Sequence, residues 1–159
     1  MQRTIFLGVL LAVSLMLSTT WAADVSGRVL DVMSIAGARA KATPPGRETT
    51  AVYLTILNNS DTEDLFVGAT TPVADKVEIR DSAKKNMVLA SVPLKRSDAL
   101  VFKPGGVHLL LSGLKRQLLP QDKFPMTFFF AKADKVMAHV LVVTPDAEVP
   151  LELGEGRWK

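Results

Sequence analysis

The sequence predicts an all-β fold, a two-sheet antiparallel sandwich with Greek-key connections, behind an N-terminal leader. Short segments rich in β-branched and aromatic residues recur along the chain, and turn residues separate them at near-regular spacing. No window keeps a 3.6-residue apolar period over three turns, so long helices are not expected. A chain of 159 residues that is 48% hydrophobic can bury one core without disulfides.

The first 22 residues have the order of a secretory signal peptide. Arg3 gives a positive start, an apolar run over residues 5–17 follows, and small residues end the segment at Ala22. A membrane anchor is the alternative, but the run is shorter than the roughly 20 residues of a spanning helix. We therefore expect cleavage after Ala22, export to the periplasm and no membrane anchor after cleavage.

The first half of the exported region, which we assign as one sandwich domain over residues 23–143, contains five expected strands. Residues 25–32 alternate loosely, and residues 50–57 (TAVYLTIL) are rich in β-branched residues up to the turn signal NNSD. Residues 65–69 are a short apolar segment, residues 76–80 (KVEIR) alternate polar and apolar, and a further segment covers residues 87–94.

The second half contains four more expected strands. Residues 99–102 lead into the turn Pro104-Gly105-Gly106, and residues 107–111 (VHLLL) follow directly. Residues 124–131 and 136–143 are separated by KADK, a hairpin-length loop. The remaining residues lose the strand pattern, so we expect an extended C-terminal tail over residues 144–159.

The composition excludes several kinds of site. With no Cys and two His, the chain cannot form a disulfide scaffold, a thiolate metal site or a three-His catalytic metal site. The formal net charge is +3, and basic residues alternate with acidic ones, so no basic stripe for nucleic acid is expected. No nucleophile elbow, phosphate-binding loop or zinc-protease motif occurs. We expect a protein that is not an enzyme and does not bind nucleic acid.

A set of collinear segments resembles the periplasmic copper chaperones called PCu(A)C. The resemblance implies a cupredoxin-like β-sandwich that binds Cu(I) and delivers it for respiratory oxidase assembly. It also implies a copper-donating or copper-receiving periplasmic protein as partner. It runs from about residue 36 to residue 143, and its main segments are 40–46 (AKATPPG), 51–56 (AVYLTI) followed by Asn58, 65–74 (LFVGATTPVA), 77–79 (VEI) and 103–109 (KPGGVHL).

The copper ligands of that family are mostly replaced in this chain. Family members hold Cu(I) with two His and two Met, donors that suit this soft ion. Carried over by position, the first His becomes Arg80, the first Met falls at Ala90 or Ser91, His108 is retained, and the last Met becomes Leu110. Three of the four ligands are therefore missing, and the resemblance implies a degenerate site with weak copper binding.

Other residues could contribute donors. Met87 lies close in sequence to the missing Met and could reach the same region. Met137 and His139 are two apart on an expected strand, so they share a face and form a second candidate pair. Core or rim packing is the alternative for that pair, and a purely structural hydrogen-bonding role is the alternative for His108.

Two functions follow from these residues. The first is a copper-chaperone-like protein that uses His108, with Met87 as a further donor. The second is a metal-free interaction or accessory module on the same sandwich in the same compartment. Exposed lysines at Lys84-Lys85 fit either simple turn charges or a docking patch for an acidic partner. The oligomeric state is left open.

Overall fold

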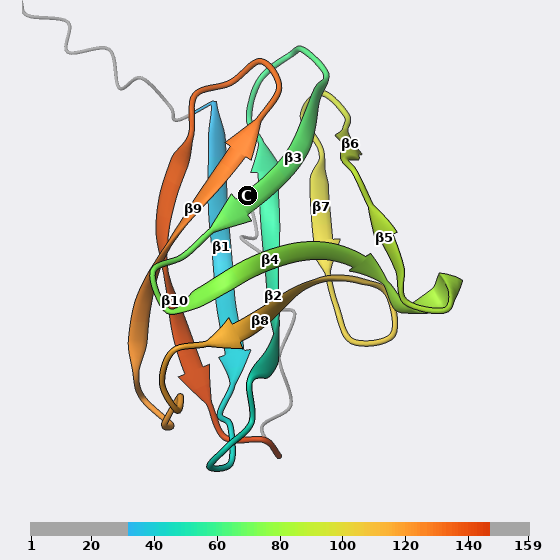
Figure 1. Ribbon diagram of the computed structural model, residues 1–159. Helices are drawn as coiled ribbons and strands as arrows, with labels where there is room; N and C mark the ends of the chain where they lie inside the picture. Colours follow the sequence, from blue (N-terminus) through green and yellow to red (C-terminus); the bar gives the residue numbers. More distant parts are fainter. Residues whose placement is uncertain (1–31, 147–159) are drawn as a thin grey trace, which may run out of the picture.

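The computed structural model describes residues 32–146 and shows a β-sandwich that closes nearly into a barrel (Figure 1). No helix in this described range is long and apolar enough to span a membrane. The predicted leader, residues 25–31 of the first expected strand and residues 147–159 of the predicted tail lie outside it. The elements are β1 (Met33–Lys41), β2 (Thr49–Asn58), β3 (Asp64–Thr70), β4 (Ala74–Asp81), the 3₁₀ helix η1 (Ser82–Lys84), β5 (Met87–Leu89), β6 (Val92–Leu94), β7 (Ala99–Phe102), β8 (Val107–Leu114), β9 (Lys123–Phe130) and β10 (Val136–Val143).

The strands follow one hydrogen-bonded path with the order β5-β4-β8-β2-β1-β10-β9-β3-β6, and β7 also pairs with β2. This arrangement confirms the predicted all-β sandwich. The expectation of a wholly antiparallel fold is wrong in one place, because β1 and β10 pair in parallel, with Arg39 opposite Leu141. The first and last described strands are thus neighbours in the sheet. All the strands between them in sequence form the connection that a parallel pair requires.

Aromatic rings from several strands fill the interior. Phe66 of β3 packs edge-on against Phe102 of β7, with 5.5 Å between ring centroids, and also contacts Phe128 and Phe130 of β9. Phe66, Phe102 and Phe128 are completely buried. Each buried ring removes a large apolar area from water, so this cluster joins the two layers of the sandwich.

Two elements differ from the sequence prediction. β1 was not expected, because its sequence MSIAGARAK is rich in Ala and Gly, which have low β-propensity. Gly37 has a φ of 60°, and the register shifts between Ala36 and Arg39, so a bulge breaks the alternation that would have indicated a strand. The expected strand over residues 87–94 is two strands, β5 on β4 and β6 on β3.

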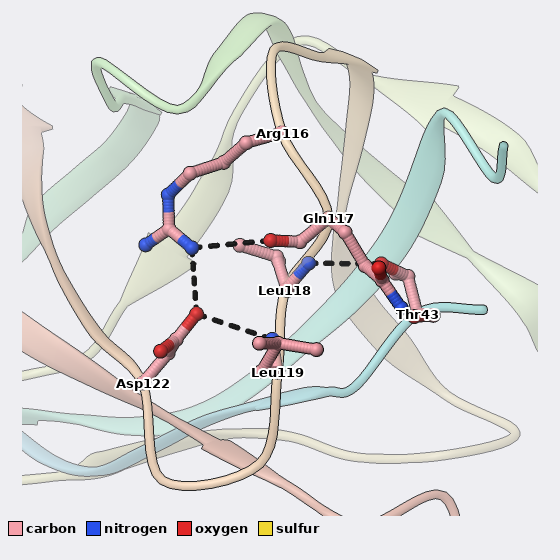
Figure 2. Close-up of polar contacts among 6 residues, drawn as sticks. All are labelled: Thr43, Arg116, Gln117, Leu118, Leu119 and Asp122. Atoms are coloured by element: carbon pink, nitrogen blue, oxygen red, sulfur yellow. Dashed lines mark hydrogen bonds and ion pairs between the residues drawn. The ribbon is translucent and has the colours of Figure 1, made fainter. Parts of the chain in front are cut away.

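The loop between β8 and β9 is fastened to the segment after β1 by a polar cluster (Figure 2). Leu118 N donates to Thr43 Oγ1 at 3.0 Å, Thr43 N donates to Leu118 O at 2.9 Å, and Gln117 Nε2 donates to Thr43 O at 2.9 Å. Arg116 Nη1 also donates to Asp122 Oδ2 at 2.6 Å. We call this set the Thr43 cluster: Thr43, Arg116, Gln117, Leu118, Leu119 and Asp122.

Candidate functional site

Three of the positions that the resemblance assigns to copper ligands, Arg80, His108 and Leu110, lie on the paired strands β4 and β8. Arg80 stands directly opposite His108, and Glu78 stands opposite Leu110. Opposed residues of an antiparallel ladder point to the same side, so these four side chains share one face of the sheet. We call the polar group around them the Arg80 cluster: Glu78, Arg80, Ser82, Asn86 and His108.

Arg80 ties β4 to the turn that follows η1. Its Nη2 donates to Glu78 Oε2 at 2.9 Å, and its Nη1 donates to the carbonyl oxygen of Asn86 at 3.4 Å. Its Nε is buried without a hydrogen-bond partner. Because a guanidinium remains protonated at any physiological pH, a fixed positive charge occupies the place of the family's first His.

Glu78 is held as an anion between two cations. Lys76 Nζ lies 2.6 Å from Glu78 Oε1, and Arg80 Nη2 binds the other oxygen. The hydrogen bonds from Lys76 and Arg80 hold the pKa of Glu78 below its ordinary value, against the opposing effect of burial. Both carboxylate oxygens are therefore engaged by basic side chains.

His108 is buried, with 8% of its surface exposed, and packs beside Tyr53 of β2 at 6.3 Å between ring centroids. Its Nδ1 lies 3.1 Å from the carbonyl oxygen of Gly106 and 3.4 Å from Ser82 Oγ. A carbonyl only accepts hydrogen bonds, so of the two tautomers of a neutral imidazole the contact with Gly106 fits the one with its proton on Nδ1. In that tautomer Nε2 keeps the lone pair that a ligand could use.

Within residues 32–146, the candidate positions bring no sulfur donor to the face of β4 and β8 that carries this imidazole. Leu110, on the same face, has none, and Ala90 and Ser91 form the short link between β5 and β6. Met87 is 49% exposed and pairs with Asp81, so it lies on the other face of the ladder from Arg80 and His108.

The second candidate pair lies elsewhere on the sheet. Met137 and His139 of β10 are both exposed and stand opposite Thr127 and Pro125 of β9. β1 and β2 separate β10 from β8 in the strand order, so this pair is remote from His108. Over residues 32–146, no group of three or more His, Cys, Asp or Glu side chains could hold a metal ion.

A cavity of about 450 Å³, lined by Met33, Asp64, Lys132 and Val136 among others, lies away from the Arg80 cluster. Burial opposes ionisation of Asp64, but hydrogen bonds from backbone N–H groups, Ala133 N foremost, outweigh it and hold its pKa below the ordinary value. Both carboxylate oxygens accept backbone N–H groups, Oδ1 from Leu65 and Lys132 and Oδ2 from Ala133. Asp64 therefore joins the start of β3 to the β9–β10 loop through backbone hydrogen bonds.

Sequence reasoning missed the partners of Arg80. Glu78 precedes it by two residues on an alternating strand, so a shared face and an ion pair could have been found from the pattern. Asn86 gave no such signal, because its contact with Arg80 uses a backbone carbonyl in a turn.

Comparisons with known proteins agree with this fold. A family model described as "LpqE-like: Putative lipoprotein LpqE-like" matches residues 33–142. An apo PCuAC domain from PmoF1 is 25% identical with a TM-score of 0.66, covering 72% of this chain and 95% of that one. A copper-bound PCuAC domain from PmoF2 is 21% identical with a TM-score of 0.65, covering 72% and 94%.

The solution structure of Cu(I)-bound DR1885 from Deinococcus radiodurans is also similar, at 24% identity and a TM-score of 0.61. The similarity covers 77% of this chain and 85% of that one. A search of curated proteins finds no match.

Proposed function

The chain belongs to the LpqE-like family, and from this premise we propose that it is an exported, non-enzymatic accessory module that binds a protein partner. It has the PCuAC-type fold. In this proposal the positions that hold Cu(I) in PCu(A)C chaperones hold no metal. The resemblance is to copper chaperones and not to enzymes, which supports a binding role.

The observation that carries the proposal is the pairing of Arg80 with His108. Directly opposed residues lie about 5 Å apart at their Cα atoms, so a copper ion on His108 would sit near a fixed guanidinium charge. Glu78 cannot offset that charge for a metal, because Lys76 and Arg80 already engage its oxygens. Leu110 adds volume but no sulfur, and Cu(I) prefers soft donors.

Hydrogen bonds of Arg80 join β4 to the turn that follows η1. Here the guanidinium bonds Glu78 on β4 and Asn86 in the next turn. The sandwich can therefore keep this corner ordered with hydrogen bonds in place of coordination bonds.

A second function, weak copper binding through His108, is favoured by the free lone pair on Nε2. A Cu(I) titration of the purified protein against a chromophoric competitor separates the two. We expect no tight binding and no difference between the wild type and His108→Ala. Tight one-to-one binding that His108→Ala abolishes would overturn the metal-free proposal.

A gain-of-function variant tests the assigned positions. Arg80→His, Ser91→Met and Leu110→Met together should create Cu(I) binding, because they restore one imidazole and two thioethers around His108. Ala90→Met replaces Ser91→Met in a parallel variant, since the two positions are adjacent. Adding His108→Ala to the triple variant should abolish the new binding. A folded triple variant that binds no copper in either form would contradict the assignment of ligand positions.

Export rests on the leader and on the lipoprotein description of the family. We expect expression in a bacterial host to yield a periplasmic protein that starts at Ala23 after cleavage behind Ala22. Intact-mass measurement of the periplasmic and membrane fractions checks both points. A full-length chain found in the membrane fraction would favour an anchor over a cleaved leader.

A further inference from the structure

Two neighbouring turns near the Arg80 cluster carry a concentration of positive charge. Lys84 and Lys85 lie in and after η1, and Lys103 lies in the β7–β8 turn; all three are exposed. Ser82 N donates to Gly106 O at 3.1 Å, which places the two turns side by side at the end of β4 (Figure 1).

The nearby acids do not neutralise this charge. The segments 82–94 and 99–110, which form the two turns and their strands, contain no Asp or Glu. Asp81 is buried, and its carboxylate caps η1 by accepting from Ala83 N at 3.0 Å. Its other oxygen lies 3.8 Å from Lys84 Nζ, a long ion pair that leaves most of the lysine charge in solvent.

The turn after η1 is held in an unusual backbone conformation. Lys85 and Asn86 have φ values of 54° and 57°, and consecutive left-handed residues other than Gly are costly. Ser82 Oγ donates to Asn86 Oδ1 at 3.1 Å, and Arg80 Nη1 binds Asn86 O. The Arg80 cluster therefore fixes the direction in which this turn presents its lysines.

Two apolar side chains lie exposed directly after the strained turn. Met87 is 49% exposed and Val88 is 52% exposed. Met87 and Val88 point to opposite faces of β5, but β5 is an edge strand, so a partner that covers its free edge beside the lysines can contact both. Such an edge combines apolar contact area with a charged rim that selects the partner.

We propose that Lys84, Lys85, Met87, Val88 and Lys103, the basic turn surface, dock an acidic surface of a partner protein. The inference deepens the proposed function, because it names the surface and the chemistry of the partner. Charge complementarity requires acidic residues on the other side. Anionic lipid recognition typically uses clusters of four to eight basic residues, and only three lysines are present here, so a protein is the better match.

Poly-L-glutamate serves as the probe, titrated into the isotope-labelled exported protein and followed by NMR. We expect shifts in residues 80–88 and 103–108, and their loss in about 1 M salt, where the Debye length is about 3 Å. Lys84→Glu with Lys85→Glu should weaken binding about tenfold, because two attractive charges become repulsive. The neutral pair Lys84→Gln with Lys85→Gln should act in the same direction with less risk to η1.

The matched control is Lys123→Glu with Lys135→Glu, two exposed lysines outside these turns, which should leave the affinity unchanged. For the apolar part, Met87→Ser should weaken binding and Met137→Ser, at the more exposed methionine, should not. Shifts that spread over other faces, or equal losses in the two lysine pairs, would overturn the proposal.

Anionic phosphatidylglycerol vesicles provide the remaining arm of the test. Vesicle binding through the same turns, with no response to polyglutamate, would replace the acidic protein by a lipid surface. The copper titration is independent of both. Tight Cu(I) binding at His108 with an intact polyglutamate response would overturn the metal-free function alone. No Cu(I) binding together with no polyglutamate response would overturn the docking surface alone.

Discussion

The Thr43 cluster and the Arg80 cluster both fasten a turn to the sandwich, but in different ways. Thr43 exchanges reciprocal hydrogen bonds with Leu118, and each donor reaches a good acceptor. Arg80 makes a long bond to Asn86, keeps a buried Nε unpaired and faces a turn with two left-handed residues. The first cluster centres on buried neutral hydrogen bonds, whereas the second centres on a partly buried ion pair beside a strained turn.

Both clusters contain a carboxylate that is ionised more readily than usual. Hydrogen bonds from Arg116 and then from Leu119 N lower the pKa of Asp122, as Lys76 and Arg80 lower that of Glu78. Similar electrostatics therefore occur in both places. The clusters differ in how deeply their uncharged residues are buried: Thr43 and Leu118 are buried, whereas Asn86 is exposed. The following substitutions test that difference.

The largest effect is expected at the buried residue of the Thr43 cluster. Leu118→Ala should lower the free energy of unfolding by about 3 kcal/mol, because Leu118 has 0% of its surface exposed and truncation leaves a cavity. Leu119→Ala is the matched control and should cost at most about 0.5 kcal/mol, since Leu119 is 52% exposed. Urea denaturation measures both, and equal losses would contradict the placement of this loop.

Thr43→Val should cost about 2 kcal/mol, because it removes the hydroxyl that satisfies the buried N–H of Leu118 while keeping the side-chain volume. Thr43→Ser, which retains the hydroxyl, should cost less in the same urea experiment. A neutral effect of Thr43→Val would show that water replaces the lost contact.

Arg80→Met should affect stability less than Thr43→Val, because it removes a partly exposed ion pair and also an unpaired buried Nε. It should raise the pKa of Glu78 toward its ordinary value, with Lys76 still lowering it, and leave Asp122 unchanged. NMR titration of the side-chain carboxyl carbons measures both shifts.

The sign of the associated pH dependence follows from linkage. The lowered pKa of Glu78 contributes stability that is present above its ordinary pKa and is lost as the pH falls through the folded-state pKa. The stability difference between wild type and Arg80→Met should therefore shrink as the pH falls below the ordinary pKa of Glu78 and through its lowered folded-state pKa. A stability gap that widens on acidification would contradict this role of Glu78.

The smallest effect is expected from relief of backbone strain. Lys85→Gly should stabilise the fold by about 0.5 kcal/mol, because glycine accepts the left-handed conformation and the gain slightly exceeds its entropic cost. Lys84→Gly, one residue earlier inside η1, should instead destabilise. Thermal unfolding of the two variants gives the sign of each change.

Most of the strands could be predicted, because the alternation of polar and apolar residues and the turn-forming residues are visible within short segments of the sequence. Residues 50–57 and 136–143 show their pattern in sequence, and β2 and β10 occur there. β1 could not be predicted, since Gly37 and the surrounding alanines hide a strand that long-range pairing creates. The parallel pairing of β1 with β10 is equally invisible to a local pattern.

The sequence supplied candidate positions for the site but not the contacts among them. The replacement of ligand positions by Arg80 and Leu110 follows from the resemblance, and the structure adds that Arg80 stands opposite His108. The contact of His108 with Ser82 requires the register of β8 on β4, which no single segment encodes, whereas Gly106 is only two residues away in the same turn. Whether His108 binds a ligand stays a prediction.

The parallel contact between β1 and β10 has a consequence for how the chain folds. The first described strand completes its pairing only when the last one is present, so the sandwich has contacts of very high sequence separation. Folds of this kind form slowly, because a long loop must close before the pairing is gained. A partly synthesised chain therefore lacks the strand that completes its sheet until residues 136–143 have been made.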